Sequence, residues 1–308
     1  MAEDSVAACP ACGARALVPW RSVPSGEPSD PRRFGLLRCT ACGSAVTGGP
    51  PPGPEAYRSG VYAPAPPRAA GLLRALQQRL DAQPARLLRR AGVPPGGRVL
   101  DAGAGRGRLV ESMAASGFAA RGIDPAPRQT SARVSQGTIE THRDSGLDAV
   151  MLWHVLEHLD DPSAALRRVA SWLRPGGAVL VAAPNLGSLQ ASIGGEGWLH
   201  FDVPRHRVHL TTRGLAALLR RAGLEPAFTE QMVWEHNPGA MWMAILTRAG
   251  MTPAFPFHLL KRNVAARPRD LALLALGAPL APAAVALEAL AARSGRGGTV
   301  AAVARRTA

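Results

Sequence analysis

The sequence predicts an α/β fold with a mainly parallel sheet covered by helices on both faces. Between residues 98 and 234, short apolar runs of strand character alternate with amphipathic helical spacing. The first run, at 98–102, leads into a loop with three glycines at alternate positions and then into helical spacing. Strands that alternate with helices in this way are typical of parallel sheets. With 308 residues, the chain is also long enough to bury a large core.

The expected elements follow in order along the chain. Residues 69–92 have helical spacing that is broken near Pro84. Alternation then predicts strands at 98–102, 119–124, 134–139, 148–154, 178–183 and 226–234, and helices at 107–116, 162–173 and 211–222. The RPGG sequence at 174–177 predicts a turn before the fifth strand. A last strand is expected at 298–305, after an apolar helical insertion at about 238–295.

Composition divides the chain into three parts. Residues 1–45 hold all four cysteines and form a candidate small module. Residues 46–68 are rich in proline and glycine and lack an apolar period, which indicates a linker. Residues 69–308 contain the alternating pattern and form the main domain.

The formal charge of +14 does not by itself indicate a nucleic-acid partner. Lys261 is the sole lysine, so nearly all of the positive charge is arginine scattered through helical stretches. Combined with heavy use of alanine, glycine and proline, this is typical of a GC-rich coding bias. Nucleic acid is therefore a disfavoured partner.

Two stretches bear on localisation. The start, AEDSVAACPACG, is acidic and then cysteine-rich, with no apolar core of a signal peptide, so we expect a cytoplasmic protein. The apolar stretch at 270–290 is interrupted by Pro279, Pro282 and Glu288, which favours buried or interfacial helices over a membrane span. The insertion at 238–292 thus offers a peripheral contact with the inner membrane surface.

The glycine loop DAGAGRG, residues 101–107, is the clearest candidate binding site. It places bare backbone and a helix N-terminus at the carboxyl edge of the sheet, where α/β folds bind ligands. A dinucleotide-binding G-x-G-x-x-G pattern would need glycine at position 108, where this chain has Arg108. The loop therefore does not call for a pyrophosphate. A tight turn without a ligand is the alternative.

A carboxylate at the end of the next strand supports ligand binding. Asp124 follows the loop by about twenty residues, a distance at which a carboxylate can accept both hydroxyls of a ribose. Loop and carboxylate together predict a nucleoside ligand.

With these motifs, the sequence resembles the class I S-adenosylmethionine-dependent methyltransferases. The segments VLDAGAGRG, GIDP, LDAVMLWHVLEHLDDP, LRPGG and LVAAPN follow the order and spacing of that family, from about 85 to 236 and through the final strand. The resemblance implies a Rossmann-like, seven-stranded sheet. It is closest to small-molecule enzymes of the ubiquinone O-methyltransferase and sugar or natural-product type, whose members can also carry an N-terminal zinc-binding region.

The resemblance implies where the methyl donor binds. Gly103, Gly105 and Gly107 would pass beside its methionine part, with Asp101 near its ammonium group.

The remaining implied donor contacts follow along the chain. Asp124 would take the ribose, Thr138 and Ile139 would flank the adenine, and Trp153 and His154 would line the pocket beside the sulfonium.

The four cysteines form two C-x-x-C pairs with 26 residues between them. Four thiolates at this spacing suit a tetrahedral Zn²⁺, and the glycine after each pair permits a tight turn. We expect Cys9, Cys12, Cys39 and Cys42 to hold a structural ion in a zinc-ribbon-like module. Disulfides are the alternative, but no thioredoxin-like strand-helix context surrounds either pair.

Two clusters are candidates for catalysis. Methyl transfer from a sulfonium is mainly a matter of alignment, and a base is needed if the acceptor is a hydroxyl or a carbon acid. In HFDVPRHRVHLT, residues 200–211, His206 is the first candidate for this base, with His209 behind it. Glu157 and His158 are equally consistent with catalysis and with orienting their loop. The alternative for the histidines is a surface turn fixed by Pro204.

The same residues fit other functions less well. His154 to His158 also matches the H-x-x-E-H motif of metalloproteases, but that motif needs a helix, and here it starts at a strand end. The only thiols are the expected zinc ligands, which disfavours cytosine or uracil C5 methylation. We therefore expect a small or lipid-linked acceptor, methylated on oxygen or carbon. A non-catalytic donor-binding scaffold and an RNA methyltransferase are the alternatives, and the oligomeric state is open.

Overall fold

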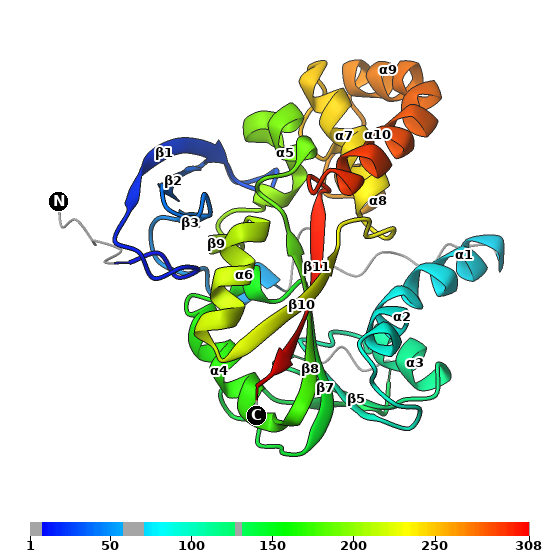
Figure 1. The fold of residues 1–308 in the computed structure, drawn as a ribbon. Helices are drawn as coiled ribbons and strands as arrows, with labels where there is room; N and C mark the ends of the chain where they lie inside the picture. Colours follow the sequence, from blue (N-terminus) through cyan, green and yellow to red (C-terminus); the bar gives the residue numbers. More distant parts are fainter. Residues whose placement is uncertain (1–7, 58–70, 127–130, 308) are drawn as a thin grey trace. The chain divides into compact units, whose positions relative to one another are not determined.

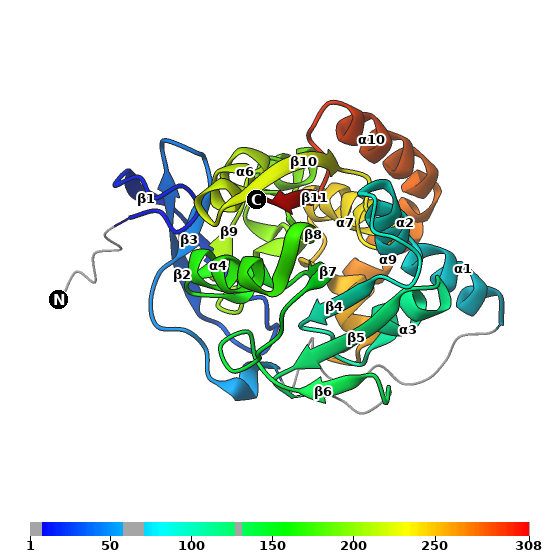
Figure 2. The same ribbon diagram turned by 60° about the horizontal axis from the view of Figure 1, so that its bottom comes forward.

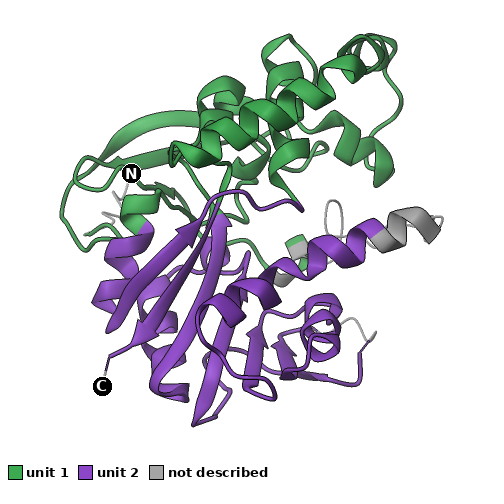
Figure 3. Cartoon of the chain, turned by 45° about the vertical axis from the view of Figure 1, so that its right-hand side comes forward, with its two compact units in different colours: residues 1–68, 184–214, 236–299 green, residues 69–183, 215–235, 300–308 purple. Residues whose placement is uncertain are grey.

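The computed structural model describes residues 8–57, 71–126 and 131–307. The chain forms two compact units, each built from separate segments. Unit 1 comprises residues 1–68, 184–214 and 236–299, and unit 2 comprises residues 69–183, 215–235 and 300–308 (Figure 3). This grouping differs from the division expected from composition, because segments from the second half of the chain join the cysteine-rich region.

A seven-stranded sheet is the centre of unit 2. Its strand order is β10-β11-β8-β7-β4-β5-β6. The strands are β4 (Arg98–Ala102), β5 (Ala119–Asp124), β6 (Val134–Gln136), β7 (Leu147–Trp153), β8 (Leu173–Pro184), β10 (Leu224–Glu230) and β11 (Thr299–Arg306). The pairs β4–β5, β5–β6, β4–β7 and β7–β8 are parallel, and β10–β11 is antiparallel. This confirms the expected Rossmann-like, mainly parallel sheet.

Helices cover both faces of this sheet, as the unbroken apolar runs of its inner strands require. On one face, α2 (Gln83–Arg90) and α3 (Arg108–Ala115) pack Leu88, Val110 and Met113 into a cluster with Val99 and Met151. Figures 1 and 2 show α4 (Pro162–Trp172) and α6 (Thr212–Arg221) on the other side. The break expected near Pro84 lies between α1 (Gly71–Asp81) and α2.

One predicted boundary is wrong in an informative way. The fifth strand was expected at 178, after a turn at RPGG, but β8 begins at Leu173. Leu147 pairs with Leu173 before the register shifts, and regular pairing resumes at Ala149 and Ala178. The turn residues therefore form an irregular extension of the strand, which a local sequence pattern does not reveal.

Unit 1 contains a separate four-stranded sheet in the order β1-β2-β3-β9. The strands are β1 (Leu17–Pro24), β2 (Arg33–Cys39), β3 (Ala45–Thr47) and β9 (Val208–His209), and all neighbours are antiparallel. In the last pair, Ala45 lies opposite His209 and Val46 opposite Val208. The predicted histidine segment thus adds a strand to the sheet of the cysteine-rich region.

The insertion before the last strand is helical, as expected. Its helices are α7 (Asn237–Arg248), α8 (Phe255–Leu260), α9 (Pro268–Gly277) and α10 (Ala281–Arg293), with a short η6 turn (Ala278–Leu280) between the last two. A further helix, α5 (Leu189–Gly194), packs beside α7 and α10 (Figure 1). Within the expected linker, Pro54–Tyr57 forms a single 3-10 turn, and residues 58–68 lie outside the described residues.

Candidate functional site

The glycine loop of unit 2 connects β4 to α3 with three residues in the left-handed region. Gly103, Gly105 and Gly107 have φ values of 92°, 55° and 77°. A Cβ at Gly103 would lie 2.5 Å from Cγ2 of Val155, whereas a Cβ at Gly105 would meet no atom of the described residues within 4 Å. The first glycine is therefore required by packing, and Gly105 leaves open space beside the loop. This space is where the sequence predicts a ligand.

Asp124, at the end of β5, is tied to the glycine loop. Its Oδ2 accepts a hydrogen bond of 2.9 Å from the Gly105 N–H, and its Oδ1 accepts one of 2.9 Å from the Ala126 N–H. Each carboxylate oxygen has a second lone pair, so both can still accept a hydroxyl. The backbone bonds fix the orientation of the carboxylate that was predicted to bind a ribose.

Asp101, in β4, is a buried carboxyl with an unsatisfied atom. Its side chain is 2% exposed, and its Oδ1 has no hydrogen-bond partner among the described residues. Burial and, secondarily, the charge of Asp124 raise the pKa of Asp101 to about 7. A cationic group beside Oδ1 would supply the missing partner and stabilise the ionised form.

The end of β7 presents Trp153 and His154. The buried Trp153 has no hydrogen-bond partner for its Nε1 among the described residues. His154 has a φ of 58°, and its Nδ1 lies 2.9 Å from Oε1 of the buried Glu157. Glu157 therefore orients the His154 ring from within the same loop.

The segment from His154 to His158 is not an α-helix. It contains one 3-10 turn, Leu156–His158, preceded by His154 in a left-handed conformation. The two histidines thus do not share a helix face, which the H-x-x-E-H zinc motif requires. The structure does not support the metalloprotease alternative.

Thr138 and Ile139 lie just after β6. Ile139 is buried, and Thr138 closes a turn in which its Oγ1 accepts a hydrogen bond of 3.2 Å from the Thr141 N–H. The local fold therefore offers an apolar side chain at this position, next to a threonine that is committed to the turn.

His206 belongs to unit 1 and is 6% exposed. Its Nδ1 donates to the carbonyl oxygen of His200 over 2.8 Å, because a carbonyl can only accept. In the neutral ring, Nε2 is then the basic nitrogen, and it lies 3.9 Å from Oδ2 of Asp202. This tautomer suits a proton acceptor that lies close to a carboxylate.

His209, in β9, is held differently. Thr47 Oγ1 donates to the carbonyl oxygen of His206 over 2.6 Å, so its oxygen accepts from Nε2 of His209 at 2.9 Å. The ring also makes an edge contact with Phe201, at 5.4 Å between centroids. His209 is thus tied to the sheet by its own Nε2, and the backbone of His206 is tied to the same threonine.

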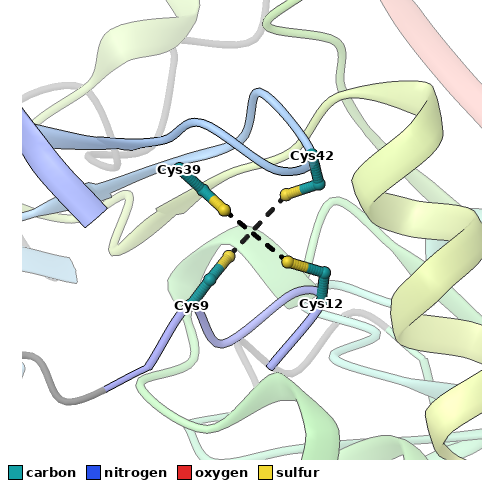
Figure 4. A group of neighbouring side chains, drawn as sticks. All are labelled: Cys9, Cys12, Cys39 and Cys42. Carbon is teal, nitrogen blue, oxygen red and sulfur yellow. Dashed lines mark hydrogen bonds between the residues drawn. The ribbon is translucent and has the colours of Figure 1, made fainter. Parts of the chain in front are cut away.

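The four cysteines of unit 1 come together at one point (Figure 4). The Sγ atoms of Cys9 and Cys42 are 3.7 Å apart, and those of Cys12 and Cys39 are 3.6 Å apart. All four are free, and all four sulfur atoms lie within 4.8 Å of one another. The arrangement is a closed cluster of four possible ligands without a disulfide.

Two similar turns present these cysteines. The Gly13 N–H donates to the Cys9 carbonyl and the Gly43 N–H to the Cys39 carbonyl, each over 2.8 Å. Gly13 and Gly43 have φ values of 80° and 78°, which only glycine adopts without strain. The glycine after each pair therefore permits the turn, as the sequence predicts.

Comparison with known proteins identifies the family. A family model described as a methyltransferase domain matches residues 73–227, about half of the chain. The chain belongs to the class I S-adenosylmethionine-dependent methyltransferases. The matched range contains the glycine loop, Asp124 and the two histidine segments, whereas the cysteine cluster of this methyltransferase lies outside it.

Individual relatives agree with this assignment. The ubiquinone biosynthesis O-methyltransferase of Xanthomonas axonopodis pv. citri is 33% identical over 163 residues, which span 46% of this methyltransferase and 68% of the relative. The protein of the same name from Bordetella bronchiseptica is 33% identical over 170 residues, 48% of this chain and 69% of the relative. A Galdieria sulphuraria protein, provisionally assigned as a sarcosine dimethylglycine methyltransferase, shares the fold with a TM-score of 0.50 and 17% identity, over 76% of this chain and 88% of its own.

The predicted site residues of the methyltransferase are divided between the two units. Every residue predicted to bind the donor lies in unit 2, together with Glu157 and His158. His206, His209 and the four cysteines lie in unit 1. Sequence reasoning missed Thr47 and Val155, which hold His209 and pack against Gly103; both are ordinary residues far from their partners in sequence, so no local pattern marks them.

Proposed function

We propose that this methyltransferase methylates an oxygen or a carbon of a small or lipid-linked acceptor. The observation that carries the proposal is the buried Asp101 carboxyl, whose Oδ1 has no hydrogen-bond partner among the described residues, in the strand that leads into the glycine loop. When bound, S-adenosylmethionine supplies a methyl group activated by a sulfonium. The name of the ubiquinone biosynthesis relatives supports a hydroxyl as the acceptor group.

The residues of unit 2 fit the parts of such a donor. Asp101 would bind the ammonium group, because an ionised carboxylate with a free lone pair is otherwise costly at a buried position. Gly103, Gly105 and Gly107 would let the backbone run along the methionine part, and Asp124 would accept the ribose hydroxyls. No side chain from Gly105 would obstruct this path.

Four further residues complete the proposed donor site. Ile139 and Thr138 would flank the adenine. Trp153, whose indole N–H has no partner in the described part of the chain, would direct this N–H into the pocket. His154 would line the same pocket, with its ring orientation fixed by Glu157.

His206 is the proposed general base. As the acceptor oxygen or carbon attacks the methyl group in line, its proton would pass to Nε2 of His206, and Asp202 would stabilise the resulting imidazolium. The hydrogen bonds of His209 and Glu157 favour positioning roles for them. His158 is the remaining candidate for a direct role.

The cysteine cluster is proposed to hold a structural Zn²⁺. Tetrahedral coordination with Zn–S bonds of about 2.3 Å separates sulfur atoms by about 3.8 Å, close to the 3.6 and 3.7 Å seen here. With four thiolates the site has no position for water, so it would organise unit 1 instead of catalysing.

Turnover and donor binding, measured on the same variants, test the function. Formation of S-adenosylhomocysteine would be followed with a catechol, a sugar and a polyprenylated hydroquinone as acceptors. His206→Asn is expected to lower turnover about 10²–10⁴-fold while calorimetry shows unchanged donor affinity. His209→Asn is the comparison and should retain more activity. Unchanged turnover in His206→Asn would reject the base, and donor binding without turnover of any acceptor would favour a scaffold.

A further inference from the structure

The helices α9 and α10 expose an unusually apolar surface. With η6 they form a continuous helical run, Pro268–Arg293, of 26 residues. Within the described residues it is the segment long and apolar enough to cross a membrane, yet only 17% of its most apolar stretch is buried. From residue 271 to residue 287 it contains no charged side chain. Such a surface on a soluble domain generally marks an interaction site.

The inner face of this run is anchored in unit 1. Glu288 is fully buried and accepts hydrogen bonds of 2.8 Å from Gln190 Nε2 and from the Gly298 N–H. Asp270, also buried, accepts from the N–H and the hydroxyl of Thr252, each over 2.8 Å. Neither carboxylate could leave these partners for a bilayer interior without a large cost. The run is therefore held along unit 1 and does not stand free as a span.

The outer face is rich in exposed leucine. Leu276 is 77% exposed and Leu290 is 59% exposed. Of the eight exposed large hydrophobic side chains among the described residues, five lie between positions 260 and 290: Leu260, Leu271, Leu276, Leu280 and Leu290. Four of these leucines lie on the run, and Leu260 ends α8 shortly before it. The apolar exposure is therefore concentrated between residues 260 and 290, and we call these five side chains the leucine face.

Positive charge flanks the leucine face at both ends. Asp270 and Glu288 are the only acidic residues between 249 and 299, and both are buried. The same stretch has six basic residues, all exposed except the half-buried lysine: Lys261, Arg262, Arg267, Arg269, Arg293 and Arg296. The charge that this region presents to solvent is thus entirely positive.

We propose that the leucine face docks on an anionic membrane surface, with the leucines at the acyl boundary and the arginines among the headgroups. An apolar helical face with basic flanks is the arrangement that binds at such an interface. A second copy of the chain is a poorer occupant, because a two-fold interface would oppose this positive patch to itself. The inference does not depend on the reaction that the protein catalyses.

Vesicle co-sedimentation of the full chain, without donor or acceptor, tests the proposal. The vesicles contain equal parts of phosphatidylglycerol and phosphatidylcholine, or phosphatidylcholine alone. We expect binding to the anionic vesicles that is at least tenfold tighter than to the neutral ones and is released by high salt. Equal binding to both, or none, would overturn the proposal, and so would release by detergent only, which would indicate a span.

Matched variants locate the surface. The pair Arg269→Gln and Arg293→Gln, one at each end of the run, should weaken binding about thirtyfold, since each arginine near an anionic surface contributes about fivefold. The pair Leu276→Ser and Leu290→Ser should weaken it at least tenfold. Leu76→Ser in α1, and the pair Arg220→Gln and Arg221→Gln in α6, are controls that should bind like wild type.

Two further outcomes would contradict the proposal. The first is that the variant with Leu276→Ser and Leu290→Ser binds vesicles as the wild type does, while circular dichroism shows that both proteins are folded. The leucine face would then not be the docking surface. If instead sedimentation equilibrium shows a dimer that the leucine pair abolishes, the face is an interface between copies. Methyl transfer to a water-soluble acceptor is measured on the same variants. A loss of activity can then be distinguished from a loss of membrane binding.

Discussion

At the scale of single residues, the protonation state of Asp101 bears most directly on donor binding. With its pKa at about 7, it is largely protonated below neutral pH in the protein without donor. Donor binding would pull this pKa down, because the ammonium group favours the ionised carboxylate. At pH 7, binding is therefore expected to release a proton.

Calorimetry can detect this release of a proton. Between pH 5.5 and 7, donor affinity should rise by up to about tenfold per pH unit. At pH 7 the apparent binding enthalpy should differ between phosphate and Tris buffers. Asp101→Asn should bind at least about tenfold more weakly and lose both effects, with Ser112→Ala on α3 as a control. Retention of the pH dependence in Asp101→Asn would assign the proton to another group.

The same pKa predicts how the stability of the protein without donor varies with pH. A raised carboxyl pKa means that the stability contributed by protonated Asp101 is complete below the unfolded value, near 4, and is lost as the pH rises through about 7. The stability of Asp101→Asn should not share this loss. Denaturant unfolding of both proteins at pH 6 and pH 8 measures it, and parallel changes in the two would contradict the assignment.

Thr47 is a residue whose importance only the structure shows. Its buried hydroxyl joins the His206 carbonyl to the His209 ring. Thr47→Val keeps the shape but removes both hydrogen bonds of this hydroxyl, at a cost of about 0.5–1.5 kcal/mol each. Denaturant unfolding should show this loss, whereas Thr40→Val, at an exposed position, should change stability little. Equal effects of the two substitutions would argue against the role of the hydroxyl.

At the scale of elements, two glycines of the same loop have different expected roles: Gly103 in packing and Gly105 in donor binding. Gly103→Ala should destabilise the protein by about 2–4 kcal/mol, because the new methyl would overlap Val155 in a left-handed backbone. Gly105→Ala meets no atom and should cost about 1 kcal/mol of stability, yet its methyl would occupy the donor's path.

Donor titration and thermal unfolding of the same alanine variants check this. Gly105→Ala should lose at least tenfold in donor affinity with little change in melting temperature. Gly96→Ala is the matched control, because it also has a left-handed backbone with open space around it. If Gly105→Ala binds donor like Gly96→Ala, the open space beside the loop is not the donor site.

The elements also show what a sequence can predict. The strands and helices around the glycine loop were predictable because buried parallel strands and amphipathic helices leave local periodic patterns. Strand β9 has only two residues, Val208–His209, and no periodicity can mark it. The irregular start of β8 depends on pairing with Leu147, a contact that local turn residues do not encode.

At the scale of the whole molecule, the sequence indicates which residues to consider for the candidate site. It does not indicate which other residues these side chains contact. The loop, Asp124 and the cysteine pairs stand at spacings that the sequence shows directly. The hydrogen bonds that assign a tautomer to His206, and the burial that raises the pKa of Asp101, arise from contacts distant in sequence. The leucine face is visible in the sequence as apolar residues, but its exposure is not.

Removal of a bound metal ion is expected to affect the two units differently. If Zn²⁺ holds the cysteine cluster, a chelator should loosen the β1-β2-β3-β9 sheet, which contains His209, and turnover should be lost. Donor affinity should change less than about twofold, since the donor residues lie in unit 2. Hydrogen exchange and calorimetry, with and without chelator, measure the two effects. Full protection of the sheet after chelation, or less than one equivalent of metal in the purified protein, would contradict the structural role.

The proposed function requires that the glycine loop and Asp124 together bind the methyl donor. The most direct measurement is a crystal structure with S-adenosylhomocysteine. We expect the ribose hydroxyls on Asp124, the amino acid part along Gly103 to Gly107, and the ammonium group beside Oδ1 of Asp101. A well-ordered ligand bound elsewhere, with this loop empty, would contradict it.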